Sequence, residues 1–239
     1  MGIFGNLFNR SDEPDLLRRM RAGADAGDVV AQRGLGALYI RGELVGQDDR
    51  KAAKWYALAA AQGDARSLFV LGELHVQGRG VQKDLDEAEK LFTMAAEQGH
   101  VAAQTSLAAL LDHRGQHARA NVWWERAGDA GDAKAAYNIG CSYNDGIGVD
   151  PDRARALHWF KRAAELGHPD AQFNLARHLT TGEGIEQDLV RAHAWLTISL
   201  GHRADDQTER LRNNVTRHLS ADQIARASEL AAELGKPSA

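Results

Sequence analysis

The side chains best suited to chemistry are a histidine pair and an aspartate near the middle of the chain. His113 and His117 flank a short loop, with Asp112 beside them, and imidazole and carboxylate groups together can hold zinc or nickel. Gly115 lies between the two histidines, so a helix is not expected to place them on one face. We therefore predict that they are solvated loop residues, and that the protein has no metal or other cofactor.

Cys141 is the only cysteine in the sequence, which excludes an internal disulfide. A reactive thiol needs a nearby cation or a helix N-terminus to lower its pKa. Cys141 instead falls in the middle of a predicted helix, without an obvious basic neighbour in the sequence, and we expect it to be inert and partly buried. The sequence also lacks the serine-hydrolase, zinc-protease, dithiol and phosphate-loop motifs. These observations predict that the protein is not an enzyme.

A fivefold internal repeat organises the chain. A glycine ends each predicted second helix, including that of an N-terminal half repeat, and successive glycines lie 36, 36, 32 and 36 residues apart. These glycines are Gly27, Gly63, Gly99, Gly131 and Gly167. Two further columns are Leu35, Leu71, Leu107, Ile139 and Leu175, and Ala52, Ala88, Ala120, Ala156 and Ala192. Around each column the apolar residues follow helical spacing, which predicts two amphipathic helices per repeat. One such pair cannot bury its apolar face alone, so the pairs must stack as a solenoid.

The loop between the two predicted helices carries its own pattern, seen in full at Gly146-Ile-Gly-Val149 and Asp152. The first glycine is expected to end the first helix, and the aspartate to cap the second. Together with the helix phrases AxYNxGxxYxxGxGVxxD and AxxWFKRAAELG, this pattern resembles the Sel-one-like repeat (SLR), a relative of the tetratricopeptide repeat. The resemblance covers about residues 14 to 234 and implies an all-α, right-handed α-solenoid of five stacked helix-turn-helix repeats.

The predicted organisation has five repeats between two caps. It comprises a loosely ordered segment 1–13, an N-terminal capping half repeat 14–27, five repeats (28–63, 64–99, 100–131, 132–167 and 168–201, together 28–201), and a C-terminal capping helix pair 202–239. Leu16 and Met20 align the half repeat with the second helices, in their alanine and aromatic columns. The third repeat lacks the glycine turn, which we expect to change the angle between neighbouring repeats.

Once the packing columns are assigned, the remaining first-helix positions should line a concave groove. In the first repeat these positions are Val30, Arg33, Ala37, Ile40 and Arg41. Over all repeats the predicted partner-binding residues are Arg33, Arg66, Phe69, Glu73, Lys134, Tyr137, Asn144, Phe173 and Arg177. Aromatic and arginine side chains are common anchors of protein interfaces. Two alternatives remain: the rings could simply pack on the neighbouring repeat, and the charges could lie on a solvated face.

The resemblance implies a non-enzymatic protein–protein interaction scaffold or adaptor that binds a peptide or helix of a partner protein. One alternative is a regulator or immunity-type inhibitor of a single partner, and a hydrolase is less favoured. A net charge of −4 gives no support for nucleic-acid binding. The N-terminal residues do not form a secretory signal, and no apolar run could make a stable membrane insertion. We therefore expect a cytoplasmic monomer or weak oligomer.

Overall fold

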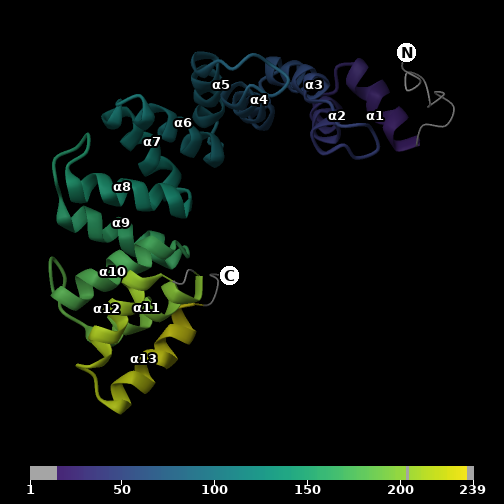
Figure 1. Cartoon of the computed structure of the whole chain (residues 1–239). Coiled ribbons are helices and arrows are strands. Elements are labelled where there is room, and N and C mark those ends of the chain that lie inside the picture. The colour runs from purple at the N-terminus through teal and green to yellow at the C-terminus, as the bar shows by residue number, and fades with distance from the viewer. Residues whose placement is uncertain (1–14, 203–204, 236–239) are drawn as a thin grey trace. The chain divides into compact units, whose positions relative to one another are not determined.

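The computed structural model describes residues 15–202 and 205–235, and in these ranges the chain forms thirteen α-helices and no strand (Figure 1). The helices are α1 (Asp15–Asp25), α2 (Val29–Arg41), α3 (Asp49–Ala61), α4 (Ala65–Gln77), α5 (Leu85–Glu97), α6 (Val101–His113), α7 (His117–Asp129), α8 (Ala133–Asp145), α9 (Arg153–Glu165), α10 (Pro169–Thr181), α11 (Leu189–His202), α12 (Asp206–Thr216) and α13 (Ala221–Leu234). The predicted all-α fold of five helix pairs is confirmed. The segment 1–13 lies outside the described residues, so its looseness stays a prediction.

The chain divides into two compact units, residues 1–103 and 104–239, and the boundary falls within α6. In the first unit, each helix from α1 to α5 packs against the next along the chain. In the second unit the same holds from α7 to α11, and α11 contacts both α12 and α13. Because contacts run mainly between consecutive helices, each unit is a stack of helix pairs.

Side-chain caps and glycines set the length of the helices. Asp28 accepts a hydrogen bond from the backbone N–H of Ala31 at 2.7 Å, and Asp48 accepts one from Lys51 at 3.0 Å. These bonds satisfy backbone donors that the first turn leaves unpaired. At the other end of α2, Gly42 adopts a left-handed conformation with φ of 71°, where a side chain would be strained. The predicted roles of the loop aspartate Asp48 and the loop glycine Gly42 are thus confirmed, whereas the cap at Asp28 is an addition from the structure.

Small residues facing large ones form the core of each helix pair. The predicted alanine column is fully enclosed, with each member at most 1% exposed. Beside it lies a column of larger side chains that are each at most 5% exposed: Tyr56, Phe92, Trp124, Phe160 and Leu196. In three pairs the first helix presents a glycine to this large side chain, and a Cβ on Gly72 would lie 2.6 Å from the Phe92 ring. The glycine therefore allows the ring to approach the helix backbone.

One predicted position of the N-terminal half repeat is wrong, although Gly27 keeps the positive φ of its column at 92°. Leu16 was assigned to the alanine column, but it is 60% exposed, whereas Leu17 is 2% exposed. Leu17 belongs to a cluster with Leu35 and Leu38 of α2, and Met20 packs against that cluster. Leu16 is exposed because no helix precedes α1 in the described residues, whereas the second helix of each full repeat packs on the helix before it.

The C-terminal helices follow the predicted pattern. The Ser220 hydroxyl accepts a hydrogen bond from the Gln223 backbone, and the Gln223 side chain accepts one from the Ser220 backbone, which completes a capping box. Ala227 on α13 is fully buried. No helix in the described ranges has the length and apolar character needed to cross a bilayer.

Candidate functional site

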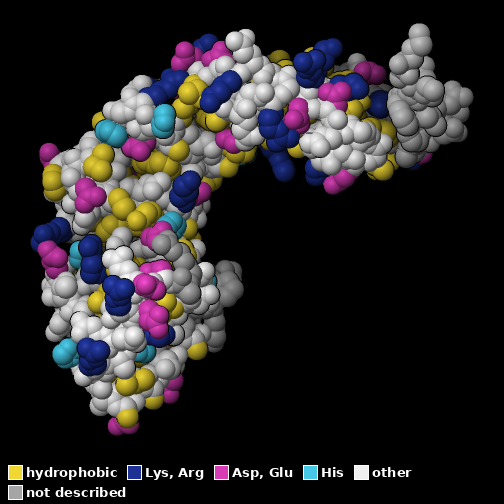
Figure 2. All heavy atoms as spheres, in the orientation of Figure 1, with side chains coloured by type: hydrophobic (Ala, Val, Ile, Leu, Met, Phe, Trp, Pro, Cys, Tyr) yellow, Lys and Arg dark blue, Asp and Glu magenta, His cyan; other side chains and the backbone are white. Residues whose placement is uncertain are grey.

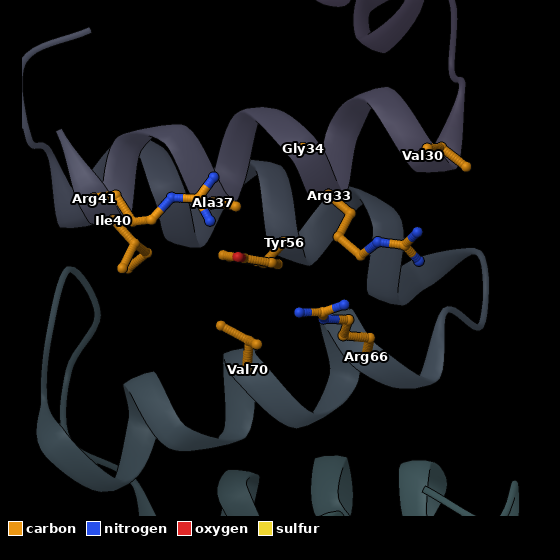
Figure 3. A pocket seen from close by; sticks show the side chains of 9 residues that line it. All are labelled: Val30, Arg33, Gly34, Ala37, Ile40, Arg41, Tyr56, Arg66 and Val70. Atoms are coloured by element: carbon orange, nitrogen blue, oxygen red, sulfur yellow. The ribbon is translucent and has the colours of Figure 1, made fainter. Parts of the chain in front are cut away.

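A hollow of about 380 Å³ opens between helices α2, α3 and α4 (Figure 3). Its lining residues are Val30, Arg33, Gly34, Ala37, Ile40 and Arg41 from α2, Tyr56 from α3, and Arg66 and Val70 from α4. We call this surface the α2–α4 hollow. All five positions that the sequence assigned to the groove of the first repeat contribute to it. It therefore combines an aliphatic wall with three guanidinium groups and one phenol hydroxyl.

The three arginines of the α2–α4 hollow are in different states. Arg33 donates a hydrogen bond to Asp64 at 2.5 Å, in an ion pair that is mostly shielded from solvent. Arg41 pairs with Glu43 at 3.0 Å, but more than half of each side chain is exposed. Arg66 is exposed, and no carboxylate among the described residues lies within ion-pair distance of it. Arg33 is thus held by the protein, whereas Arg66 is available to a ligand.

The Arg33–Asp64 pair also caps α4. Burial alone would raise the pKa of Asp64, but hydrogen bonds from Ser67 and the charge of Arg33 outweigh it and hold that pKa below its usual range. The Asp64 carboxylate therefore stays charged, and Arg33 turns toward the N-terminal end of α4 in Figure 3. The ion pair links the first repeat to the second.

Tyr56 lies at the centre of the α2–α4 hollow. Its side chain is 5% exposed, and no hydrogen bond joins its hydroxyl to another described residue. Burial raises the pKa of Tyr56 and outweighs the opposing effect of Arg66, Arg41 and Arg33. Figure 3 shows Arg41 and Arg66 directed toward Tyr56 from α2 and α4. The phenol is therefore neutral and can donate a hydrogen bond into the hollow.

Two of the predicted groove rings pack on the next repeat. The Phe69 ring stacks on His100 with centroids 4.9 Å apart, and Tyr137 stacks on His168 at 4.4 Å. Both rings are half-buried, and each histidine directly follows the terminal glycine of the repeat that carries the ring. The alternative that the sequence left open, packing on the neighbouring repeat, accounts for these contacts. Phe69 and Tyr137 thus have a structural partner already.

The other predicted residues are distributed over both units. Arg66, Lys134 and Arg177 are exposed, and Glu73, Asn144 and Phe173 are half-buried. Asn144 donates a hydrogen bond to Asp145 at 2.6 Å, so its amide is partly engaged within the same helix. Of the nine predicted binding residues, only Arg33 and Arg66 line the α2–α4 hollow. Lys134, Tyr137 and Asn144 lie on α8, and Phe173 and Arg177 lie on α10.

Sequence reasoning missed one important side chain of the hollow. Tyr56 belongs to a packing column, and its ring does fill the core, so its hydroxyl was not considered. The signal was present in the sequence: the equivalent residues in the other four repeats are Phe92, Trp124, Phe160 and Leu196. A hydroxyl in only one member of an apolar column indicates a polar neighbour at that position.

The two histidines of the third repeat lie at helix ends, His113 at the end of α6 and His117 at the start of α7. His117 and Asp112 are joined by a hydrogen bond of 2.8 Å across the short α6–α7 connection. Nowhere in the described ranges do three histidine, cysteine or acidic side chains converge in a way that could hold a metal ion. Cys141 is half-buried, and burial raises the pKa of its thiol, which opposes thiolate reactivity.

The charges of the visible surface are mixed. Lysine and arginine side chains alternate with aspartate and glutamate over the face in Figure 2. The whole chain has 29 basic and 33 acidic residues, so its net charge is −4. The protein is not generally basic, so the three arginines around the α2–α4 hollow are a local concentration of positive charge.

The sequence matches a known family over most of its length. The Sel1 repeat family model matches residues 29–64, 65–100, 103–132, 133–168 and 169–199. A solved structure, c5321, a protective antigen of uropathogenic Escherichia coli strains with an SLR fold, is 30% identical with a TM-score of 0.79 over 91% of this chain, which spans 48% of that protein. A Sel1 repeat protein from Oxalobacter formigenes is 28% identical with a TM-score of 0.76, covering 94% of this chain and 95% of its own. Comparison with curated proteins finds no match. The chain belongs to the Sel1 repeat family.

Proposed function

We propose that this protein is a non-enzymatic scaffold or adaptor that holds a peptide or helix of a partner protein against the first helices of its repeats. Proteins of the Sel1 repeat family are generally protein-interaction scaffolds. The observation that carries the proposal is the α2–α4 hollow, which lies where first-helix residues are left free of packing. The single cysteine also fits action in the reducing cytoplasm, which we include in the proposal.

The chemistry of the hollow favours binding. Its aliphatic wall can bury an apolar side chain of a partner away from water. Its guanidinium groups can donate charge-assisted hydrogen bonds. Protein interfaces combine these features, with arginine and tyrosine prominent among the residues that dominate the binding energy. A partner segment that reaches Tyr56 could also accept a hydrogen bond from its hydroxyl.

A matched pair of substitutions tests the proposal. Val30 lines the hollow and is 64% exposed, whereas Leu58 lies on α3 outside the lining and is 49% exposed. Val30→Glu and Leu58→Glu each place a carboxylate on an exposed aliphatic position. Val30 lies in the first turn of α2, where a negative charge is favourable, so its replacement should leave the fold intact.

The assay is affinity capture from a lysate with the wild type and both variants, followed by calorimetry with each purified partner. Partners that bind the wild type and Leu58→Glu, but not Val30→Glu, would support the proposal. A single partner bound with nanomolar affinity would favour the regulator or immunity-type alternative over a scaffold. Equal capture by all three proteins, or no capture at all, would refute binding at this surface.

A further inference from the structure

We propose that the α2–α4 hollow selects an acidic segment of its partner, with one carboxylate bound by Arg66 and the Tyr56 hydroxyl. An aliphatic side chain of the same segment would pack against Ala37, Ile40 and Val70. This inference rests on the proposed function and narrows it to one chemical class of partner.

Charge complementarity is the first argument. None of the residues lining the hollow is acidic. The charge of Arg33 is balanced by Asp64, while Arg66 has no such pair within the described part of the chain. The Arg41–Glu43 pair is open to solvent, where an ion pair contributes little and exchanges easily. A carboxylate entering the hollow would therefore meet one uncompensated cation and a second that can be recruited.

The Tyr56 hydroxyl is the second, independent argument. The Tyr56 residue is 5% exposed, but its hydroxyl is not among the enclosed side-chain polar atoms of the described residues, and no hydrogen bond joins it to another of them. The hydroxyl therefore lies open to the hollow, where a ligand can reach it. The hydroxyl can donate, and a carboxylate oxygen can accept. Among the five repeats only the first has a tyrosine at this position, so the polar group is specific to this hollow.

The aliphatic wall defines the second part of the recognised segment. Ala37 and Ile40 come from α2 and Val70 comes from α4, and together they line the hollow beside the cations. In an extended peptide, side chains two residues apart point the same way and are about 6.6–6.8 Å apart along the chain. The expected pattern is therefore an acidic residue and an aliphatic residue separated by one position.

Two synthetic peptides test this inference directly. The first is a fluorescein-labelled peptide of three Glu-Ser-Leu units, and the second replaces every glutamate with glutamine. In fluorescence anisotropy at low salt, the acidic peptide should bind at least about tenfold more tightly than the amide peptide. Its affinity should also decrease as salt is added, because the contact is electrostatic.

Arg66→Gln is the matching change in the protein, and Lys54→Gln is its control. Both side chains are exposed, but Lys54 lies on α3 outside the lining of the hollow. Arg66→Gln should weaken binding of the acidic peptide about tenfold and leave the thermal unfolding midpoint unchanged. Lys54→Gln should alter neither quantity.

Equal affinity for the two peptides, or full affinity after Arg66→Gln, would overturn acidic selection. If acidic selection failed in this way but Val30→Glu still abolished partner capture, the proposed function would stand without acidic selection. If Arg66→Gln left peptide affinity unchanged and Val30→Glu left partner capture unchanged, both the inference and the proposed function would be refuted. A labelled single-stranded oligonucleotide that bound more tightly than the peptide, and depended on Arg66, would also overturn it, because the cations would then serve a phosphate backbone.

Discussion

Replacing Gly72 with alanine should reveal how closely the two helices of a repeat fit together. A Cβ at this position would lie 2.6 and 2.7 Å from two ring atoms of Phe92, well inside van der Waals contact. The fifth repeat shows another solution, because its equivalent residues are Ala176 and Leu196. The third repeat shows a further solution, because Ala108 stands there opposite Trp124, across a shorter connection between the two helices. Alanine therefore occurs in this chain where the facing side chain or the connection differs from that of the second repeat.

The expected free energies follow from two opposing effects. Overpacking a core costs about 1–3 kcal/mol, whereas replacing a glycine within a helix by alanine gains about 1 kcal/mol. Gly72→Ala alone should therefore destabilise by about 0–2 kcal/mol. In a Phe92→Leu background the overlap is gone and the helix gain remains, so the same change should stabilise by up to about 1 kcal/mol. The interaction energy between the sites is then about 1–3 kcal/mol, as for other contacting residues.

Urea unfolding followed by helical ellipticity would measure all four members of the cycle. Gly201→Ala is a suitable control, because Gly201 is a helical glycine whose Cβ would meet no atom within 4 Å. It should show a propensity gain alone, and a smaller one than at Gly72, because Gly201 lies in the last turn of its helix. If Gly72→Ala had the same effect on stability with phenylalanine and with leucine at position 92, the packing argument would be wrong.

Two further predictions concern pH and the tryptophans. Burial lowers the pKa of His168, which stacks on Tyr137, so the unfolded chain binds a proton more readily than the folded chain. The free energy of unfolding should therefore decrease as the pH drops below about 6.5. His168→Asn should reduce the decrease in urea midpoint between about pH 7 and 5. The same dependence of the urea midpoint on pH in the wild type and the variant would contradict this. Trp124 is 4% exposed, so Trp124→Ala should cost about 3–5 kcal/mol. Trp123→Ala should cost clearly less, because Trp123 is half-exposed beneath the Arg126 guanidinium, and equal unfolding midpoints would refute this ranking.

The fold could be predicted because packing imposes the same residue type at the same position in every repeat. Ala52 and its equivalents are enclosed between two helices, so a larger residue at any of them would push the pair apart. The exception is Leu16, because α1 has only α2 beside it in the described residues and lacks the preceding helix that covers Ala52 in a full repeat. The repeat pattern gives the register of a half repeat, but not which of its positions lose their packing partner.

The binding surface was harder to predict because one residue type can serve either packing or recognition. Phe69 and Tyr137 are of the aromatic type that often anchors protein interfaces. In this structure, however, they stack on His100 and His168 of the next repeat. Such contacts join residues 31 positions apart, a separation that also holds for Arg33 and Asp64. The structure shows that the column of Arg33, Phe69 and Tyr137 faces the column 31 residues later. Once that separation is known, complementary pairs at this spacing can be recognised in the sequence.

The column that contains Arg33 and Phe69 also explains why a hollow forms at the first repeat. In the second repeat Phe69 lies 5.9 Å from the Phe92 ring of the second helix, and so covers the core residue beneath it. In the first repeat the equivalent residue is Arg33, which pairs with Asp64 instead of packing a ring over Tyr56, and the largely buried Tyr56 lines the hollow there. The change from a ring to an arginine therefore opens the surface, and the change from phenylalanine to tyrosine beneath it supplies a hydrogen-bond donor. Two substitutions within an otherwise regular repeat are enough to turn a packing position into a candidate recognition site.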